Sequence, residues 1–364
     1  MRTRSPAAAD PPIRTATQHD RPAPHSVDCR TGVHVMPLQL SIAVGDYDRV
    51  RPLVDGSVRI DGVDPVFMLL EPEEIFFRAF RHADFDVCEL SMSSFVVKTA
   101  TGDCPYVGVP VFPSRAFRHT SIYIRTDRGI ARPEDLKGKR IGVPEYQVTA
   151  NVWTRLMLEE EHDVKPSDVT WVRGGYDHPG RIEKIALRLP SNVRIEDAPE
   201  DETISGMLAK GDIDAVIGPR APSCFEQGHP KVAWLYVNPT AAATAWYRKT
   251  RIFPIMHILG VRKTLAEHHP WLPMALLKAF QQAKARALTK LGDCSATKVT
   301  LPFIEEQLHA ARQLMGEDFW SYGLDANRHV LNVFLRRHHS EGLSPRELKP
   351  EDMFHHSTHE SHRI

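Results

Sequence analysis

Residues 110–125, PVFPSRAFRHTSIYIR, decide how the rest of this chain is arranged. Arg115, Arg118 and His119 lie within five positions of one another, and the alternating residues that follow them predict a strand. Residues 247–263, YRKTRIFPIMHILGVRK, form a matching segment later in the chain. We interpret the two segments as crossings between two lobes, and we expect a cleft for an anionic small molecule between these lobes.

The composition excludes several classes of protein. The length of 364 residues predicts two lobes, and 46 basic residues balance 46 acidic ones, which argues against binding to nucleic acid or to a membrane surface. No apolar run is long enough to span a bilayer. The five cysteines are scattered and form no CxxC pair, as expected of a reduced, cytoplasmic protein. A homo-oligomer stays open.

The two ends of the chain differ from its middle. Residues 1–36 are rich in Pro, Arg and Ala and lack the apolar segment of a secretory signal, so we predict a disordered extension. Met36 opens the first well-patterned strand and is an alternative start of translation. Residues 346–364 form a polar, His-rich tail, which we expect to be loosely held.

Between these ends, predicted strands alternate with predicted helices, which is typical of an α/β protein with mostly parallel sheets. We assign residues 37–120 and 248–345 to the first lobe and residues 121–247 to the second lobe. The sequence has neither a GxGxxG nor a GxxxxGK[ST] motif, so nothing indicates a nucleotide-binding loop.

Polar candidates follow the ends of several predicted strands, where open α/β sheets bind ligands. Asp46 either contacts the ligand or caps the helix near Arg49. Ser91 opens a polar loop. Glu145 and Tyr146 precede a helix whose N-terminal N–H groups favour an anion. For these two residues, the alternatives are a solvated carboxylate and a packed ring.

Several long motifs resemble those of one family. They are PVFPSRAFRHTSIYIR, EDLKGKRIGVPEYQVTANVW, WVRGG, PGRIEK, GDIDAVIGPRAP, YRKTRIFPIMHILGVRK and HHPWLP. Over about residues 38–343 the chain resembles the 4,5-dihydroxyphthalate decarboxylases, which look like a soluble offshoot of the type 2 periplasmic binding-protein fold. The resemblance implies a two-lobed α/β fold with two crossover strands. It also implies a cytoplasmic carboxy-lyase without an organic cofactor, which acts on a small aromatic carboxylate.

The substrate that the resemblance implies sets what the site must contain. Its ring carries two adjacent carboxylates, and each of them is para to a hydroxyl group. Loss of a phenolic proton pushes electron density onto the carboxylate-bearing carbon, a general acid protonates this carbon, and CO₂ leaves as the ring regains aromaticity. The site therefore needs cations for the remaining carboxylate, an acceptor near the phenols and a proton donor.

Arginines suit the first role, because a guanidinium group binds a carboxylate through two hydrogen bonds. Arg115 and Arg118 in the first crossing are candidates, and Arg220, in the GPRAP loop of the second lobe, is a further one. The alternative for the first two is an ion pair with Glu89 or a neighbouring aspartate. Glu89 itself ends an apolar strand, so this carboxylate must be paired or protonated, or must serve as an acid or base for the ligand.

Imidazole groups suit the proton donor, since histidine titrates near neutral pH. His119 and His257 each lie on a crossing, although a hydrogen-bonded structural role is the alternative for either one. Glu145 is a candidate acceptor for the phenolic proton, and Tyr247 is a weaker candidate for substrate binding. A catechol-like substrate could chelate a divalent ion, so metal dependence stays open, but no HExxH or HxH spacing is present.

Two alternatives to the decarboxylase remain. The first is a binding protein that delivers an aromatic acid to an ABC transporter, because fold alone does not separate the two functions. The second is a related lyase or hydrolase acting on another aromatic acid. It is favoured by residues 241–246, AAATAW, where similar sequences tend to carry an acidic residue before the tyrosine.

Overall fold

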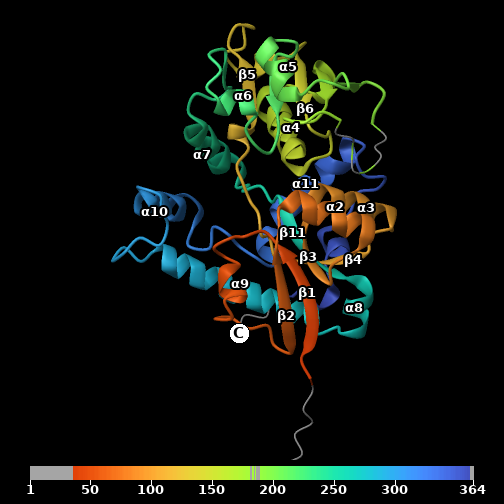
Figure 1. Ribbon diagram of the computed structural model, residues 1–364, viewed down its shortest axis with the longest axis vertical. Coiled ribbons are helices and arrows are strands. Elements are labelled where there is room, and N and C mark those ends of the chain that lie inside the picture. The colour runs from red at the N-terminus through yellow and green to blue at the C-terminus, as the bar shows by residue number, and fades with distance from the viewer. Residues whose placement is uncertain (1–35, 181–182, 184, 186–188, 361–364) are drawn as a thin grey trace, which may run out of the picture. The chain divides into compact units, whose positions relative to one another are not determined.

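The computed structural model describes residues 36–180, 183, 185 and 189–360. The predicted N-terminal extension therefore lies outside the described residues, except for Met36, and so does the very end of the predicted tail. The described chain contains two mixed β-sheets, one for each predicted lobe (Figure 1).

The sheet of the first lobe has the strand order β2-β1-β3-β11-β4. Its strands are β1 (Leu38–Val44), β2 (Val63–Leu69), β3 (Val87–Ser91), β4 (Tyr106–Val109) and β11 (His257–Arg262). β1 runs parallel to β2 and β3, whereas β11 runs antiparallel to both of its neighbours. A distant part of the chain thus returns to complete this sheet.

The sheet of the second lobe has the order β10-β5-β9-β6-β7-β8. Its strands are β5 (Ile122–Arg125), β6 (Arg140–Val143), β7 (Thr170–Arg173), β8 (Arg194–Asp197), β9 (Ala215–Ile217) and β10 (Val232–Trp234). β6 is parallel to β7 and β9, and β7 is parallel to β8, but β5 is antiparallel to β9 and β10. The prediction of mostly parallel sheets therefore fails at β5 and β11, the strands that enter a sheet directly from the other lobe.

Helices flank both sheets. Those before the first crossing are α1 (Arg51–Val54), α2 (Pro72–His82) and α3 (Met92–Thr101). Those between the crossings are α4 (Thr149–His162), α5 (Ile204–Lys210), α6 (Ser223–Glu226) and α7 (Pro239–Thr250). Those after the second crossing are α8 (Lys263–His268), α9 (Leu272–Leu291), α10 (Ile304–Met315), α11 (Arg328–Ser340) and α12 (Pro350–Met353). None of the helices described combines the length and the apolar character needed to cross a bilayer.

Two connecting segments lie side by side between the sheets. We call residues 110–121 the first crossing segment and residues 251–256 the second crossing segment. An antiparallel bridge joins Arg115 to Ile255, and the N–H group of Met256 donates to the carbonyl of Ser114 at 2.9 Å. The lobe boundary that we placed after residue 247 falls inside α7, because this helix continues to Thr250 and ends where Arg251 adopts a positive φ of 58°.

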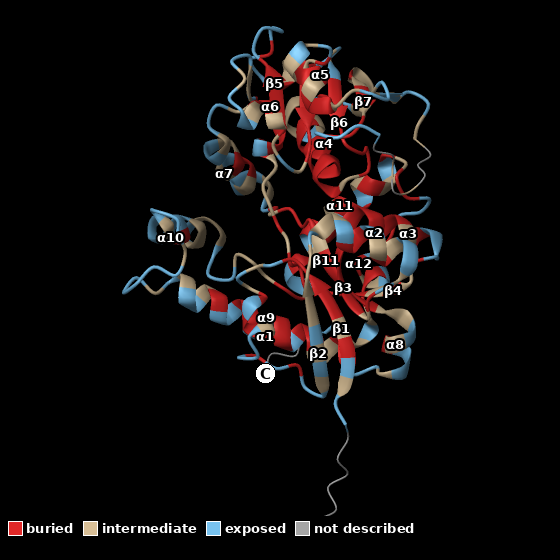
Figure 2. Ribbon diagram, in the orientation of Figure 1, coloured by how far each residue is buried: buried red, intermediate tan, exposed pale blue. Residues whose placement is uncertain are grey.

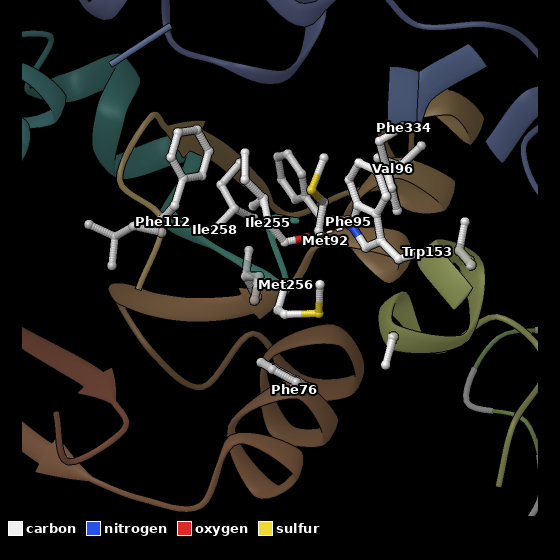
Figure 3. Close-up of a cluster of buried hydrophobic side chains, with 14 of the residues drawn as sticks. Phe76, Met92, Phe95, Val96, Phe112, Trp153, Ile255, Met256, Ile258 and Phe334 are labelled. Carbon is white, nitrogen blue, oxygen red and sulfur yellow. Dashed lines mark hydrogen bonds between the residues drawn. The ribbon is translucent and has the colours of Figure 1, made fainter. Parts of the chain in front are cut away.

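Helix α4 anchors the second crossing segment. Its indole donor, Trp153 Nε1, binds the carbonyl of Ile255 at 2.9 Å, and the ring packs 5.1 Å from that of Phe334 in α11 (Figure 3). Most of α4 is buried, as the red ribbon in Figure 2 shows. A helix buried on nearly all sides is typical of the interior of a large protein.

The C-terminal segment packs more firmly than we predicted for a loose polar tail. Met353 and Phe354 are buried, and Phe354 forms a bridge to Gly108 in β4. A Cβ atom at Gly108 would lie 2.5 Å from the carbonyl oxygen of Met353, so only glycine permits this close approach. The reason is that three buried apolar side chains, those of Leu348, Met353 and Phe354, hold this otherwise polar segment in place.

A buried ion pair joins α4 to the end of α11. Nη2 of Arg155 lies 2.6 Å from Glu341 Oε2, both side chains are almost fully buried, and Arg155 also donates to the carbonyl of Tyr146 at 2.7 Å. Arg337 binds the same carboxylate at 2.7 Å through its Nε atom.

We predict that Arg155→Met lowers the free energy of unfolding by about 3 kcal/mol, because it leaves Glu341 buried with fewer partners. Urea denaturation followed by circular dichroism measures this loss. The control is Arg132→Met, since Arg132 is exposed and its ion pairs contribute at most about 1 kcal/mol. Equal losses for the two variants would contradict the structural role given to Arg155.

Candidate functional site

A pocket of about 390 Å³ opens between the two lobes, and we call it the interlobe pocket. From the first lobe and the crossing segments it is lined by Tyr47, Glu71, Pro72, Glu73, Phe76, Ser91, Ser94, Ser114, Arg118, Met256 and His257. From the second lobe it is lined by Gln147, Val148, Thr149, Ala150, Pro219 and Arg220. Four predicted site residues, Ser91, Arg118, Arg220 and His257, are therefore brought together here.

Two helix N-termini meet at this pocket. The first turn of α4 begins at Thr149, whose Oγ1 atom accepts a hydrogen bond from the N–H group of Ser93 in α3 at 3.0 Å. The same oxygen shares a hydrogen bond of 3.1 Å with Ser91 Oγ. The partial positive charge of both helix ends therefore faces the same space, which favours a bound anion.

Arg118 adds a full positive charge to the pocket. Its Nε atom lies 3.1 Å from Met256 Sδ and its Nη1 atom lies 3.4 Å from the carbonyl oxygen of Pro219. No carboxylate within the described part of the chain forms an ion pair with it. Burial lowers the pKa of Arg118 to about 10, which still leaves the guanidinium group charged at neutral pH. A partly buried cation without a counter-ion is the arrangement that an anionic ligand would complete.

His257 is held in place by a buried carboxylate. Its Nδ1 atom is hydrogen bonded to Glu89 Oε1, which also accepts a bond of 2.9 Å from the hydroxyl of Tyr47. The N–H group of Gly45 donates to the other oxygen of Glu89 at 2.9 Å. Because an ionised carboxylate only accepts, Nδ1 carries a proton and Nε2 is the nitrogen left for a ligand. The ring of Phe76 packs edge-on, with its centre 4.9 Å from that of the imidazole.

The ionisation of this group follows from its contacts. Burial by itself would raise the pKa of Glu89, but the charge of His257 and the hydrogen bonds from His257, Gly45 and Tyr47 lower it below its usual range. Burial and the neighbouring Glu89 raise the pKa of Tyr47, so this phenol stays protonated. Glu89 is therefore the partner of a histidine. The sequence had suggested an arginine as its partner, as one of two interpretations.

Arg220 and Glu73 form an ion pair across the mouth of the pocket. Nη2 of Arg220, in the second lobe, lies 3.3 Å from Oε1 of Glu73, in α2 of the first lobe. Both side chains are exposed, at 61% and 41%, so the contact contributes little to stability. It leaves the guanidinium group free to exchange one carboxylate for another.

Two other predicted contacts lie on a different face of the crossing segments. Arg115 is buried and donates to the carbonyls of Phe253 at 3.0 Å and Ser321 at 2.8 Å, and it also binds Asn327. Tyr247 lies beside Arg115 in a separate pocket of about 330 Å³. We predicted Arg115 as a substrate contact, but its donors are used to hold loops of the first lobe together.

Glu145 and Tyr146 are buried and do not line the interlobe pocket. Glu145 is fully buried, and its carbonyl accepts a bond of 2.8 Å from Asn151 in α4. The ring of Tyr146 lies 3.8 Å below the guanidinium group of Arg155, and burial raises the pKa of this tyrosine to about 12. From this loop it is the next residue, Gln147, that faces the pocket.

Asp46 is exposed and binds Arg51 of α1, so it neither lines the pocket nor caps that helix. The residue after it, Tyr47, lines the pocket instead. Sequence analysis missed Tyr47, Phe76, Ser94, Ser114, Gln147, Thr149 and Met256 among the lining residues. Glu89 could have indicated some of these residues from the sequence, because a carboxylate at the end of an apolar strand requires a partner nearby.

His119 lies outside the interlobe pocket, although it is next to Arg118 in sequence. It is buried between Tyr236 and Trp246, with ring centres 5.1 and 6.0 Å away. Burial lowers the pKa of His119 to about 4, so the imidazole is neutral at neutral pH. A neutral ring turned away from the pocket does not meet the requirements for the proton donor that we predicted. Among the described residues, no group of three His, Cys, Asp or Glu side chains could hold a metal ion.

Two lobes joined by paired crossing segments, with a ligand-sized pocket between them, define a periplasmic binding-protein-like fold. The alkanesulfonate-binding protein SsuA of Xanthomonas axonopodis pv. citri, solved with bound MOPS, matches 87% of this chain and 98% of its own with a TM-score of 0.51 and 14% identity. A putative sulfonate-binding SsuA of Methylobacillus flagellatus matches with a TM-score of 0.52 and 12% identity, over 88% of this chain and 92% of its own. The family model described as NMT1/THI5 like matches residues 116–183.

Sequence relatives are far more similar. The 4,5-dihydroxyphthalate decarboxylase of Comamonas testosteroni is 67% identical over 327 residues, which cover 90% of this chain and 99% of the relative. The enzyme of the same name from Pseudomonas putida is 74% identical over 211 residues, which cover 58% of this chain and 82% of the relative. The chain belongs to the 4,5-dihydroxyphthalate decarboxylase family.

The burial of His119 predicts a specific pH dependence of stability. The unfolded chain takes up a proton at this residue below about pH 6.5, whereas the folded chain resists protonation until about pH 4. The contribution of His119 to the free energy of unfolding is therefore complete above about pH 6.5 and is lost as the pH falls to about 4. Between pH 7 and pH 5 the free energy of unfolding of the parent protein decreases. In the His119→Gln variant we expect this decrease to be smaller by roughly 2 kcal/mol.

Urea denaturation at the two pH values measures this difference. The control is His82→Gln, since His82 is exposed at the end of α2 and its replacement should leave the pH response of the parent intact. An unchanged pH response in His119→Gln would mean that His119 is not held neutral by the fold.

Proposed function

We propose that this chain catalyses the non-oxidative decarboxylation of 4,5-dihydroxyphthalate to 3,4-dihydroxybenzoate and CO₂. The observation that carries this proposal is the 67% identity to the Comamonas testosteroni decarboxylase, which extends over 99% of that protein. The interlobe pocket supports it independently, because it combines positive charge, apolar walls and an oriented imidazole group.

The substrate is a flat dianion, and the pocket offers matching contacts. Arg118 and the N-terminal turn of α4 bind the carboxylate that stays on the ring. Phe76 and Met256, which face each other in Figure 3, pack on the ring. Arg220 leaves Glu73 and binds the carboxylate from the second lobe, so that the substrate itself draws the lobes together.

His257 is the proposed proton donor. Its Nε2 atom transfers a proton to the ring carbon that bears the departing carboxylate, while the para hydroxyl releases its proton to solvent water and its oxygen takes carbonyl character. The C–C bond then breaks, its electron pair returns to the ring, CO₂ leaves, and the para oxygen takes a proton back from solvent water. Overall the substrate dianion takes up one proton and yields one CO₂ and the product monoanion. Glu89 acts as a positioning residue, because its hydrogen bond to Nδ1 fixes the orientation of the imidazole ring.

Polar side chains of the pocket serve the two phenolic hydroxyl groups in this proposal. Ser91, Ser94 and Gln147 lie on the same wall as the helix N-termini and can both donate and accept hydrogen bonds. We assign neither Glu145 nor Tyr146 to this role, because both are buried and neither lines the pocket.

The same proposal includes a cytoplasmic location. Cys88, Cys104, Cys224 and Cys294 are free thiols, which is typical of a reducing compartment. A homo-oligomer is compatible with this function and is tested by light scattering.

A direct assay tests the reaction. Purified protein incubated with 4,5-dihydroxyphthalate, with and without a chelator, is expected to release CO₂ and 3,4-dihydroxybenzoate in equal amounts. Chromatography and CO₂ trapping measure the two products. Saturable binding without turnover would instead identify a binding protein. The structural relatives named above are described as binding proteins. Turnover of another aromatic acid alone would identify a related lyase.

The two assigned side chains should differ in their kinetic effect. Arg118→Ala removes an ion pair with the bound carboxylate and should raise KM roughly 10- to 100-fold. His257→Gln removes the proton donor and should lower kcat by about 10²- to 10⁴-fold with a small change in KM. The matched controls are Arg286→Ala and His82→Gln, which replace exposed residues away from the pocket. Parent-like kinetics for Arg118→Ala or His257→Gln would remove that residue from the site.

A further inference from the structure

A second, larger pocket lies on the other face of the first crossing segment. Its volume is about 950 Å³, and it is bounded by the crossing segment, by α7 and by α10. Ser114 and Arg118 of the crossing segment line the interlobe pocket, whereas Phe117 and His119 line this second pocket. One stretch of backbone therefore separates the two spaces, and neighbouring side chains point into opposite ones.

The walls of the second pocket are apolar and its charge is positive. Phe117, Ala243 of α7 and Leu314 of α10 are among the apolar lining residues. Arg248 and Arg251 also line it, and neither forms an ion pair with any acidic residue that the structure describes. No Asp or Glu is present among its described lining residues. Two cations without counter-ions above apolar walls match an anion with an apolar body.

A buried polar atom of one lining residue lacks a hydrogen-bond partner within the described chain. His119 is only 4% exposed, and its Nδ1 atom forms no hydrogen bond with the described residues. The same holds for Nε1 of Trp246, whose ring centre lies 6.0 Å from that of His119. Buried polar groups are normally satisfied, so the unsatisfied Nδ1 atom of His119, a residue that lines the pocket, indicates a place where a bound molecule supplies the partner.

We propose that the second pocket is a binding site for an organic anion with a flat, apolar body, separate from the interlobe pocket. The anionic group binds Arg248 and Arg251, and the apolar body lies between α7 and α10 on Phe117. A polar atom of the ligand reaches Nδ1 of His119. This site does not depend on the reaction proposed for the interlobe pocket.

A fluorescence titration with 8-anilinonaphthalene-1-sulfonate, an aromatic sulfonate, tests the site on the full-length protein. We expect saturable binding to the parent protein. The double variant Arg248→Ala/Arg251→Ala should weaken binding roughly tenfold, or about 1.4 kcal/mol, because it removes two exposed ionic contacts. Ala310→Trp, on the α10 wall, should also weaken it by filling the space. Thermal melts of each variant verify that it is folded.

Two controls locate the probe. Arg286→Ala removes an exposed cation of α9 that lines neither pocket and should bind the probe like the parent. Arg118→Ala changes only the interlobe pocket and should do the same. Parent-like affinity in both the double variant and Ala310→Trp would overturn the proposal, and so would loss of probe binding in Arg118→Ala alone. The proposal would also be overturned if light scattering showed that the parent protein is a dimer and this dimer bound no probe, because a second copy would then cover the pocket.

Discussion

The pairing of the two crossing segments is the constraint on which the rest of this structure depends. Residues 110–121 leave the first lobe and residues 251–256 return to it, and the antiparallel bridge between Arg115 and Ile255 makes them neighbours. Trp153 ties the carbonyl of Ile255 to α4, so the second lobe is attached to the crossings through its most buried helix. Two paired segments restrict the possible motions between lobes far more than a single linker would.

This pairing also explains why charged and titratable groups collect at the interlobe pocket. Arg118 comes from the first crossing segment, His257 follows the second, and both project between the sheets. The strand ends of the first lobe and the helix N-termini converge on the same space. A site built in this way contains residues from distant parts of the chain, and it combines residues of helices and strands with residues of the loops that follow strand ends.

The interlobe pocket contains one arginine without a counter-ion among the described residues and, at its mouth, a second arginine that is paired with a glutamate. Glu89 is paired inward with His257, so its charge orients the imidazole ring and is shielded from the pocket. Arg118 has no such partner within the described chain and faces the pocket. At the mouth, Glu73 neutralises Arg220 through an exposed contact that a ligand can replace. An anion in this pocket would therefore meet one arginine to which the described chain gives no counter-ion and one arginine whose ion pair it can replace.

By itself, the sequence determined the local elements, the two-lobed α/β class and the family. Alternating apolar residues, helix-ending glycines and long family motifs all act over short distances along the chain, so they can be read without coordinates. It also indicated Ser91, Arg118, Arg220 and His257, because each adjoins a strand end or a crossing.

Only the tertiary structure decided which face of a segment each side chain occupies. Arg115 and His119 are one to three residues from Arg118, yet they line other pockets, because the crossing segment turns into a short 3₁₀ helix at His119–Ser121 and this turn directs neighbouring side chains apart. The partner of Glu89 was equally hidden, because His257 lies 168 positions away in sequence and becomes its neighbour only when β11 pairs with β3. Contacts between residues so far apart arise from packing, which local sequence patterns do not encode.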